Sequence, residues 1–76
     1  MATLRELRYR EVVKRLRRLG FRFYRHGRRS HKLWVRDDDG LVVPVPRHEG
    51  NPIRKGTVRA IIREIGVSVD EFMELK

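Results

Sequence analysis

Apolar residues near the start of the chain recur with the period of an α-helix. Within residues 9–19 the apolar positions follow the spacing i, i+3, i+4, i+7 and i+10, so they share one helix face. They are Tyr9, Val12, Val13, Leu16 and Leu19. Thr3 and Glu6 have the spacing of a capping box, and Gly20 suits the left-handed cap that ends many helices. The pattern predicts one amphipathic helix between Thr3 and Gly20. The predicted outward-facing residues of this helix are basic: Arg10, Lys14, Arg17 and Arg18.

After Gly20 the period changes to two, as in strands with one buried face. The alternation runs through residues 21–24, 31–36 and 41–45. The predicted inward-facing residues are Phe21 and Phe23, then His31, Leu33 and Val35, then Leu41, Val43 and Val45. Asp39-Gly40 is a strong hairpin signal, and Gly27 marks the earlier turn. Because Pro44 lacks a backbone N–H, the third strand is expected at an edge of the sheet.

A second helical pattern follows a polar loop and ends at Gly66. Its apolar residues are Val58, Ile61, Ile62 and Ile65. Ser68 and Glu71 again have capping-box spacing, ahead of a short apolar face made by Val69, Phe72 and Met73. The predicted element order is therefore α-β-β-β-α with a short final helix.

These elements predict an α+β fold of two layers, a three-stranded antiparallel sheet with the helices on one face. Each helix has one apolar stripe and the sheet has one apolar face, so stacking the helices on that face buries all of them. The opposite face of the sheet is expected to remain exposed. It would carry Arg22, Tyr24, Lys32, Trp34 and Arg36.

Size limits the possible functions. With 76 residues and no cysteine, the chain is expected to form a single domain, residues 1–76, without disulfides or thiolate zinc sites. A large nucleotide-binding enzyme fold is excluded. No stretch approaches the ~20 apolar residues that span a bilayer, so we expect a soluble, cytoplasmic protein with no membrane partner.

The charge of the chain is strongly positive and unevenly placed. Formal net charge is +9, and residues 1–36 hold thirteen Lys and Arg but only two Glu. Such a field attracts polyanions, of which nucleic acid is the commonest in a cell. An arginine-rich surface also occurs in heat-adapted proteins, but ion-pair networks there need carboxylates among the arginines.

The predicted exposed sheet face combines cations with aromatic rings. Bases stack on aromatic side chains while phosphates contact Arg and Lys, so this face favours single-stranded RNA. The residues assigned to it are Arg22, Tyr24, Lys32 and Trp34. The alternative for Trp34 is packing under a loop or at a partner interface.

Three histidines, His26, His31 and His48, fall at strand ends or in polar loops. Histidine is the residue type that most readily transfers protons at neutral pH. We favour His31, which follows Ser30 and two arginines, Arg28 and Arg29, that are placed to hold a phosphate. His48 is a candidate second acid or base. Most surface histidines are merely solvated, so this assignment depends on its context.

RNA provides a reason why imidazole groups suffice. Its 2′-hydroxyl is a nucleophile already tethered to the scissile phosphate, so a base, an acid and a cation can promote cleavage without a metal or cofactor. Other chemistries fit less well. Asp37-Asp38-Asp39-Gly40 is typical of a hairpin turn, the histidines lack zinc-ligand spacing, and Ser30 lacks a nucleophile elbow.

Several short motifs, taken in order, resemble the HicA-type toxins of toxin–antitoxin pairs. They are Leu19-Gly20-Phe21, Ser30-His31, Val45-Pro46-Arg47-His48, Gly56-Thr57-Val58, and the run from Ile61 to Gly66. The resemblance covers the chain from the first helix to Phe72.

The resemblance implies a double-stranded-RNA-binding-domain-like fold and an mRNA-cleaving ribonuclease with its catalytic histidine at the Ser-His position, here His31. It also implies a HicB-type antitoxin as protein partner. The family usually has glycine before Ser-His, where this chain has Arg29, so the turn there is expected to shift or be strained if positive φ is needed. The alternatives are an RNA-binding domain without catalysis and an interaction protein that binds no nucleic acid.

Overall fold

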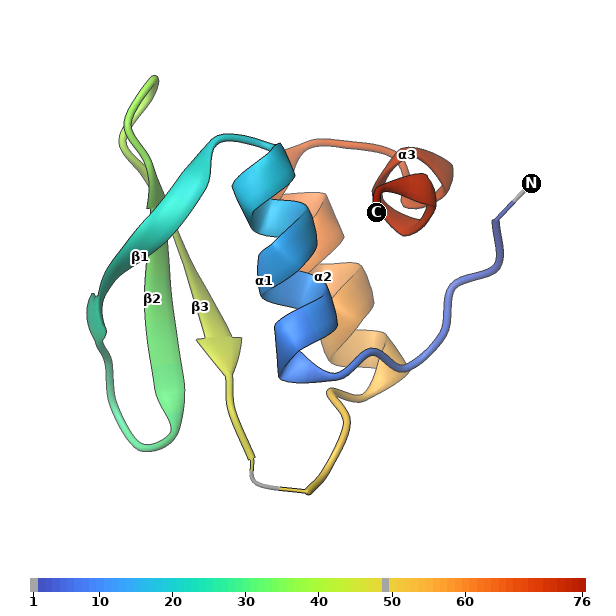
Figure 1. Cartoon of the computed structure of the whole chain (residues 1–76), viewed down its shortest axis with the longest axis horizontal. Coiled ribbons are helices and arrows are strands. Elements are labelled where there is room, and N and C mark those ends of the chain that lie inside the picture. The colour runs from blue at the N-terminus through green and yellow to red at the C-terminus, as the bar shows by residue number, and fades with distance from the viewer. Residues whose placement is uncertain (1, 49) are drawn as a thin grey trace.

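The computed structural model describes residues 2–48 and 50–76. Its elements are α1 (Tyr9–Arg18), β1 (Phe21–His26), β2 (His31–Arg36), β3 (Leu41–Pro46), α2 (Lys55–Ile65) and α3 (Val69–Glu74). The predicted element order and the α+β class are confirmed. Figure 1 shows α1 and α2 stacked beside the sheet, with α3 at one end of the helical layer.

The sheet is an antiparallel meander in the order β1-β2-β3. β3 lies at an edge, as Pro44 predicts. At the Asp39-Gly40 hairpin, Gly40 has φ +72° and its N–H donates to the carbonyl of Arg36 at 2.8 Å. On the other side, the pairing of β1 with β2 shifts by one residue between Phe23 and Arg25, which leaves Tyr24 as the extra residue of a bulge.

The hydrophobic core lies between the sheet and the helices. Every apolar position assigned to α2 is buried, and so are Val12, Val13 and Leu16 of α1. Gly66 ends α2 with φ +77°, and the Ser68 hydroxyl caps α3 by accepting from the N–H of Glu71 at 3.0 Å. The periodic patterns thus located the buried faces of α1 and α2 correctly, together with the C-terminal end of α2 and the N-cap of α3.

The assignment of faces in β2 was wrong. Trp34 is only 2% exposed and belongs to the core, and its indole N–H donates to the Tyr9 hydroxyl at 3.2 Å. Trp34 pairs directly with Phe23 and Val43. Because directly paired residues share a face, all three lie on the helix side of the sheet. The set His31, Leu33 and Val35 therefore lies on the opposite face, where Val35 is nevertheless buried, at 8% exposed, and His31 and Leu33 are half-buried. The indole of Trp34 has a large apolar area and its N–H has a hydrogen-bond partner, so burying it favours the strand orientation that turns Trp34 toward the helices.

Two other expectations were also wrong. The first helix begins at Tyr9, not after Thr3, and Glu11 caps it by accepting the N–H of Arg8 at 2.9 Å. This hydrogen bond lowers the pKa of Glu11. Before α1 the chain is extended, and Leu7 exchanges two backbone hydrogen bonds with Ile53. In β1, Phe23 faces the helix side but is 42% exposed at the edge of the sheet.

A buried guanidinium joins α1 to α3. Arg15 is 8% exposed, and burial lowers its pKa. Its Nε and Nη2 donate to the carbonyls of Phe72 and Met73 at 3.1 and 3.3 Å, while Nη1 donates to the carbonyl of Glu11 at 3.0 Å. Since the carbonyls of Phe72 and Met73 lie in the last turn of α3, the arginine holds the end of the chain against α1.

Candidate functional site

The turn that precedes β2 sets the position of His31. The N–H of Gly27 donates to the His31 carbonyl at 2.9 Å, and the N–H of His31 donates to the Arg28 carbonyl at 3.0 Å. Arg29 has φ +55°, the only positive φ among the described non-glycine residues. It therefore adopts the left-handed conformation that glycine adopts more easily. This conformation strains the turn by about 1 to 2 kcal/mol.

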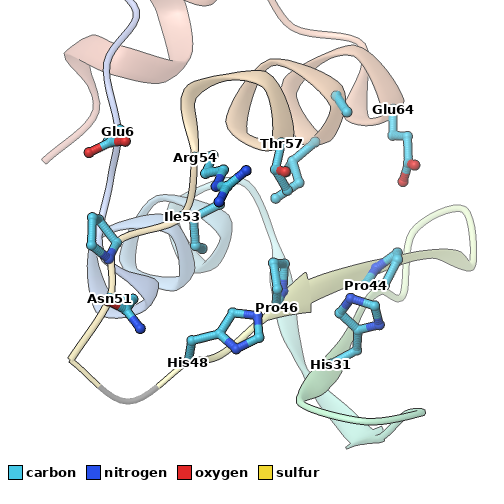
Figure 2. A pocket seen from close by; sticks show the side chains of 13 residues that line it. Glu6, His31, Pro44, Pro46, His48, Asn51, Ile53, Arg54, Thr57 and Glu64 are labelled. Carbon is cyan, nitrogen blue, oxygen red and sulfur yellow. The ribbon is translucent and has the colours of Figure 1, made fainter.

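A groove beside β3 brings His31 and His48 together. It has a volume of about 730 Å³, and we call it the histidine groove. Figure 2 shows both imidazoles along one wall, next to Pro44 and Pro46 of β3. The facing wall carries Arg54 and Thr57, from the start of α2. His31 opens β2 and is half-buried, while His48 follows β3 and is exposed.

The sheet register explains why these two histidines meet. His31 pairs with Pro46, and the ladder continues one step further because the N–H of Arg47 donates to the Ser30 carbonyl at 3.0 Å. His48 is the next residue, so the backbone of β2 and β3 fixes both imidazoles relative to each other. Ser30 is half-buried, and it accepts this hydrogen bond through its backbone carbonyl.

His31 also borders a second cavity, of about 480 Å³, on the hairpin side. Arg28 lines this cavity with Arg25, His26 and Leu33. Arg28 therefore shares a surface with His31, and its role as a phosphate contact stays a prediction. Arg29, the neighbouring predicted contact, is exposed but lines neither this cavity nor the histidine groove.

The predicted base-stacking surface is not formed as expected. Trp34 is buried in the core and is unavailable to a base, so this assignment is corrected. Its ring lies under the guanidinium of Arg17 at 4.9 Å. Tyr24 is 48% exposed at the bulge, with Arg25 over its ring at 5.4 Å. Lys32 lies on the helix-side face with Trp34, where its Nζ donates to Nδ1 of His26 at 2.8 Å.

Two arginines of the sheet are already paired with carboxylates. Arg22 makes a bidentate contact with Asp37 at 2.8 and 3.0 Å, and Arg36 makes one with Asp39 at 3.1 and 2.7 Å. The guanidinium of Arg36 lowers the pKa of Asp39 to about 2. The acidic loop therefore forms the hairpin tip and its ion pairs. Within residues 2–48 and 50–76, no three His, Asp or Glu side chains are grouped so that they could hold a metal ion.

Sequence reasoning missed Arg54 and Thr57. Both stand on the wall that faces the histidines. The helical pattern indicated where α2 begins but not that its first turn faces His31, because that depends on how the helix packs on β3. The Gly56-Thr57-Val58 motif was the only signal in this region.

Comparison with known families identifies the family of the chain. The model of the family described as "HicA toxin of bacterial toxin-antitoxin" matches residues 9–67, from the first residue of α1 to just beyond α2. The chain belongs to the HicA toxin family. As a HicA toxin it is one component of a toxin–antitoxin system, so an antitoxin partner is expected. His31, His48 and Arg54 all lie within the matched span.

No curated protein and no solved structure matches the HicA chain. None of the described helices of this HicA toxin has the length and apolar character needed to cross a membrane.

Proposed function

We propose that this HicA toxin is an endoribonuclease that cleaves mRNA with His31 and without a metal or cofactor. The observation that supports the proposal most is the shared groove: two histidines at the ends of neighbouring strands line one cavity with Arg54. Membership of the HicA family adds the toxin context. The excess of positive charge in residues 1–36 supports RNA as the substrate.

The proposed reaction uses the RNA's own 2′-hydroxyl as nucleophile. One imidazole, in its neutral form, accepts the proton of that hydroxyl as the 2′-oxygen bonds to phosphorus. The bond from phosphorus to the 5′-oxygen breaks, and the other imidazole, in its protonated form, donates a proton to that oxygen. The products are a 2′,3′-cyclic phosphate and a 5′-hydroxyl. His31 is one of the two imidazoles, and His48 is proposed as the other.

The guanidinium of Arg54 is proposed to stabilise the charge that develops on the phosphoryl oxygens. It is exposed and faces the imidazoles across the groove, where it offers a cation to a bound phosphate. Glu6 and Glu64 line the same groove, so Arg54 is the cation that must offset their negative charge. Arg28, which shares the hairpin-side cavity with His31, is proposed to contact the next part of the strand. RNA contacts by Arg29, Ser30, Lys32, Tyr24 and Arg22 stay predictions, because none of these residues lines the histidine groove or the hairpin-side cavity.

The partner proposed for this toxin is a HicB-type antitoxin. Covering the histidine groove would block RNA access, because His31 and His48 both open onto it. A partner surface rich in Asp and Glu would complement the cationic half of the chain. We place the reaction in the cytoplasm, where mRNA is available.

Cleavage of a labelled RNA in EDTA tests the proposal. We expect wild-type protein to cut the RNA, and His31→Ala to lose at least ~100-fold of the rate while retaining RNA affinity. His26→Ala is the matched control for catalysis, because His26 is exposed and does not line the histidine groove. His26 does line the hairpin-side cavity with Arg28, so the cleavage rate of this control is compared at saturating RNA. Fluorescence anisotropy gives the affinity of each variant.

Each outcome of this test has a distinct meaning. Equal cleavage by wild type and His31→Ala would refute the assignment of His31. Loss of wild-type cleavage on adding EDTA would refute metal independence. RNA binding with no cleavage by any variant would establish instead a non-catalytic RNA-binding domain of the same fold.

A further inference from the structure

A further cavity lies where the start of α1 meets the end of β3. It has a volume of about 490 Å³, and we call it the arginine cavity. Three arginines and one aromatic ring line it: Arg8, Arg10, Arg47 and Tyr9. It shares His48 and Asn51 with the histidine groove, so the two hollows have a common wall. The arginine cavity is therefore next to the proposed reaction site.

Arg47 is held in place from two sides. Its backbone N–H donates to the Ser30 carbonyl at 3.0 Å, directly beside His31. Its guanidinium lies over the ring of Tyr9 at 5.2 Å, and the Tyr9 hydroxyl accepts the hydrogen bond of the buried Trp34. This series of contacts runs from the core to the cavity. A cation ordered in this way loses less entropy on binding an anion than one on a free side chain.

The charge of the cavity is the second observation. None of its described lining residues is acidic, and no ion pair within the described part of the chain involves Arg8, Arg10 or Arg47. Arg22 and Arg36, in contrast, are each matched by a carboxylate. Guanidinium groups that line one cavity, with no carboxylate among its described lining residues, suit a phosphate, whose oxygens accept their N–H donors.

We propose that the arginine cavity binds a backbone phosphate of the RNA, adjacent to the phosphate that is cleaved in the histidine groove. This inference rests on the proposed ribonuclease function. His48 stands between the two hollows, so a strand that places its scissile phosphate between His31 and Arg54 continues past His48 toward Arg47. The cavity selects for substrate length rather than base identity, because phosphates carry no sequence information.

Substrates of different length test this subsite. A dinucleotide has one phosphodiester, which occupies the histidine groove, whereas a hexanucleotide has further phosphates that reach the arginine cavity. We expect Arg10→Gln and Arg47→Gln each to raise KM for the hexanucleotide about tenfold, with kcat unchanged. Neither substitution should change kcat/KM for the dinucleotide. The matched control is the double variant Arg59→Gln/Arg63→Gln, which removes exposed arginines of α2 that line none of these cavities.

Binding measurements separate the subsite from catalysis. In the His31→Ala background, anisotropy gives hexanucleotide affinity against salt. Each cavity arginine removed should make the slope of log affinity against log salt shallower by ~0.7. Arg10→Gln serves as the second variant if Arg47→Gln disturbs folding, because Arg10 is exposed and its side chain makes no hydrogen bond or ion pair with the described residues.

The outcomes are distinguishable. If wild type cleaves nothing but the arginine variants bind the hexanucleotide more weakly than the control, the phosphate subsite stands and the nuclease proposal fails. If cleavage occurs and the arginine variants match the control on both substrates, the subsite is refuted, and the cavity is left as a surface for an acidic protein partner.

Discussion

Removing the buried guanidinium of Arg15 should destabilise the domain through the loss of α3 docking. Arg15→Met keeps the length and apolar stem of the side chain but removes three donors, to the carbonyls of Glu11, Phe72 and Met73. A hydrogen bond from a charged donor contributes roughly 1.5 to 3 kcal/mol when its partner is left unsatisfied. Burial of the charge itself offsets part of this sum, and its effect is visible in the lowered pKa of Arg15.

We therefore expect Arg15→Met to lower the free energy of unfolding by about 2 to 3 kcal/mol. A domain of this size has a total stability of roughly 4 to 11 kcal/mol, so the loss is a large fraction. Urea unfolding followed by the fluorescence of Trp34 measures it, since this is the only tryptophan and it is buried. The midpoint of thermal unfolding should fall by about 8 to 24 °C.

Arg18→Met is the matched control, because Arg18 is an exposed arginine of the same helix. Amide hydrogen exchange adds a local readout, in which α3 should lose protection before the sheet does. If Arg15→Met is as stable as Arg18→Met, the apolar side chain has fully replaced the buried ion, and the account of α3 docking is wrong.

Three further results are expected. Trp34→Ala should cost about 3 to 5 kcal/mol in urea unfolding, because it empties a core position; a cost below 1 kcal/mol would mean that the indole faces solvent. Arg29→Gly should be more stable than Arg28→Gly by about 1 to 2 kcal/mol in thermal unfolding, since only Arg29 has positive φ; equal stabilities would show that the turn is unstrained. The pKa of Asp39 is about 2 in the folded chain. Because an unfolded aspartate has a pKa of about 3.9, its stabilising effect is present above pH ~4 and is lost as the pH falls toward 2. Asp39→Asn should reduce this acid sensitivity in pH-dependent unfolding, whereas Asp38→Asn should not; equal slopes for both would contradict the ion pair.

The periodic patterns predicted most of the fold because they record which side of each element is buried. The α2 stripe and the Asp39-Gly40 turn were found from local residue type and spacing alone. The face of β2 that turns toward the helices was not found in this way. Leu33 and Val35 lie on one face of the strand and Trp34 on the other, and the apolar alternation favours the face with Leu33 and Val35. The deciding contact is with the hydroxyl of Tyr9, in another element.

The candidate site was predictable where the hairpin register determines it. A turn at Asp39-Gly40 pairs His31 with Pro46, so His48 had to lie close by. Arg54 was missed because its position depends on helix packing. Arg15 had a local signal that was overlooked: it lies three residues after Val12 and four before Leu19, on the apolar face of α1.

The ends of the RNA products test the central claim most directly. In EDTA, wild-type protein should leave a 2′,3′-cyclic phosphate on one fragment and a 5′-hydroxyl on the other, both visible by mass spectrometry, and His31→Ala should leave neither. Fragments with a 3′-hydroxyl and a 5′-phosphate would contradict the account, because water rather than the ribose hydroxyl would then have attacked the phosphate.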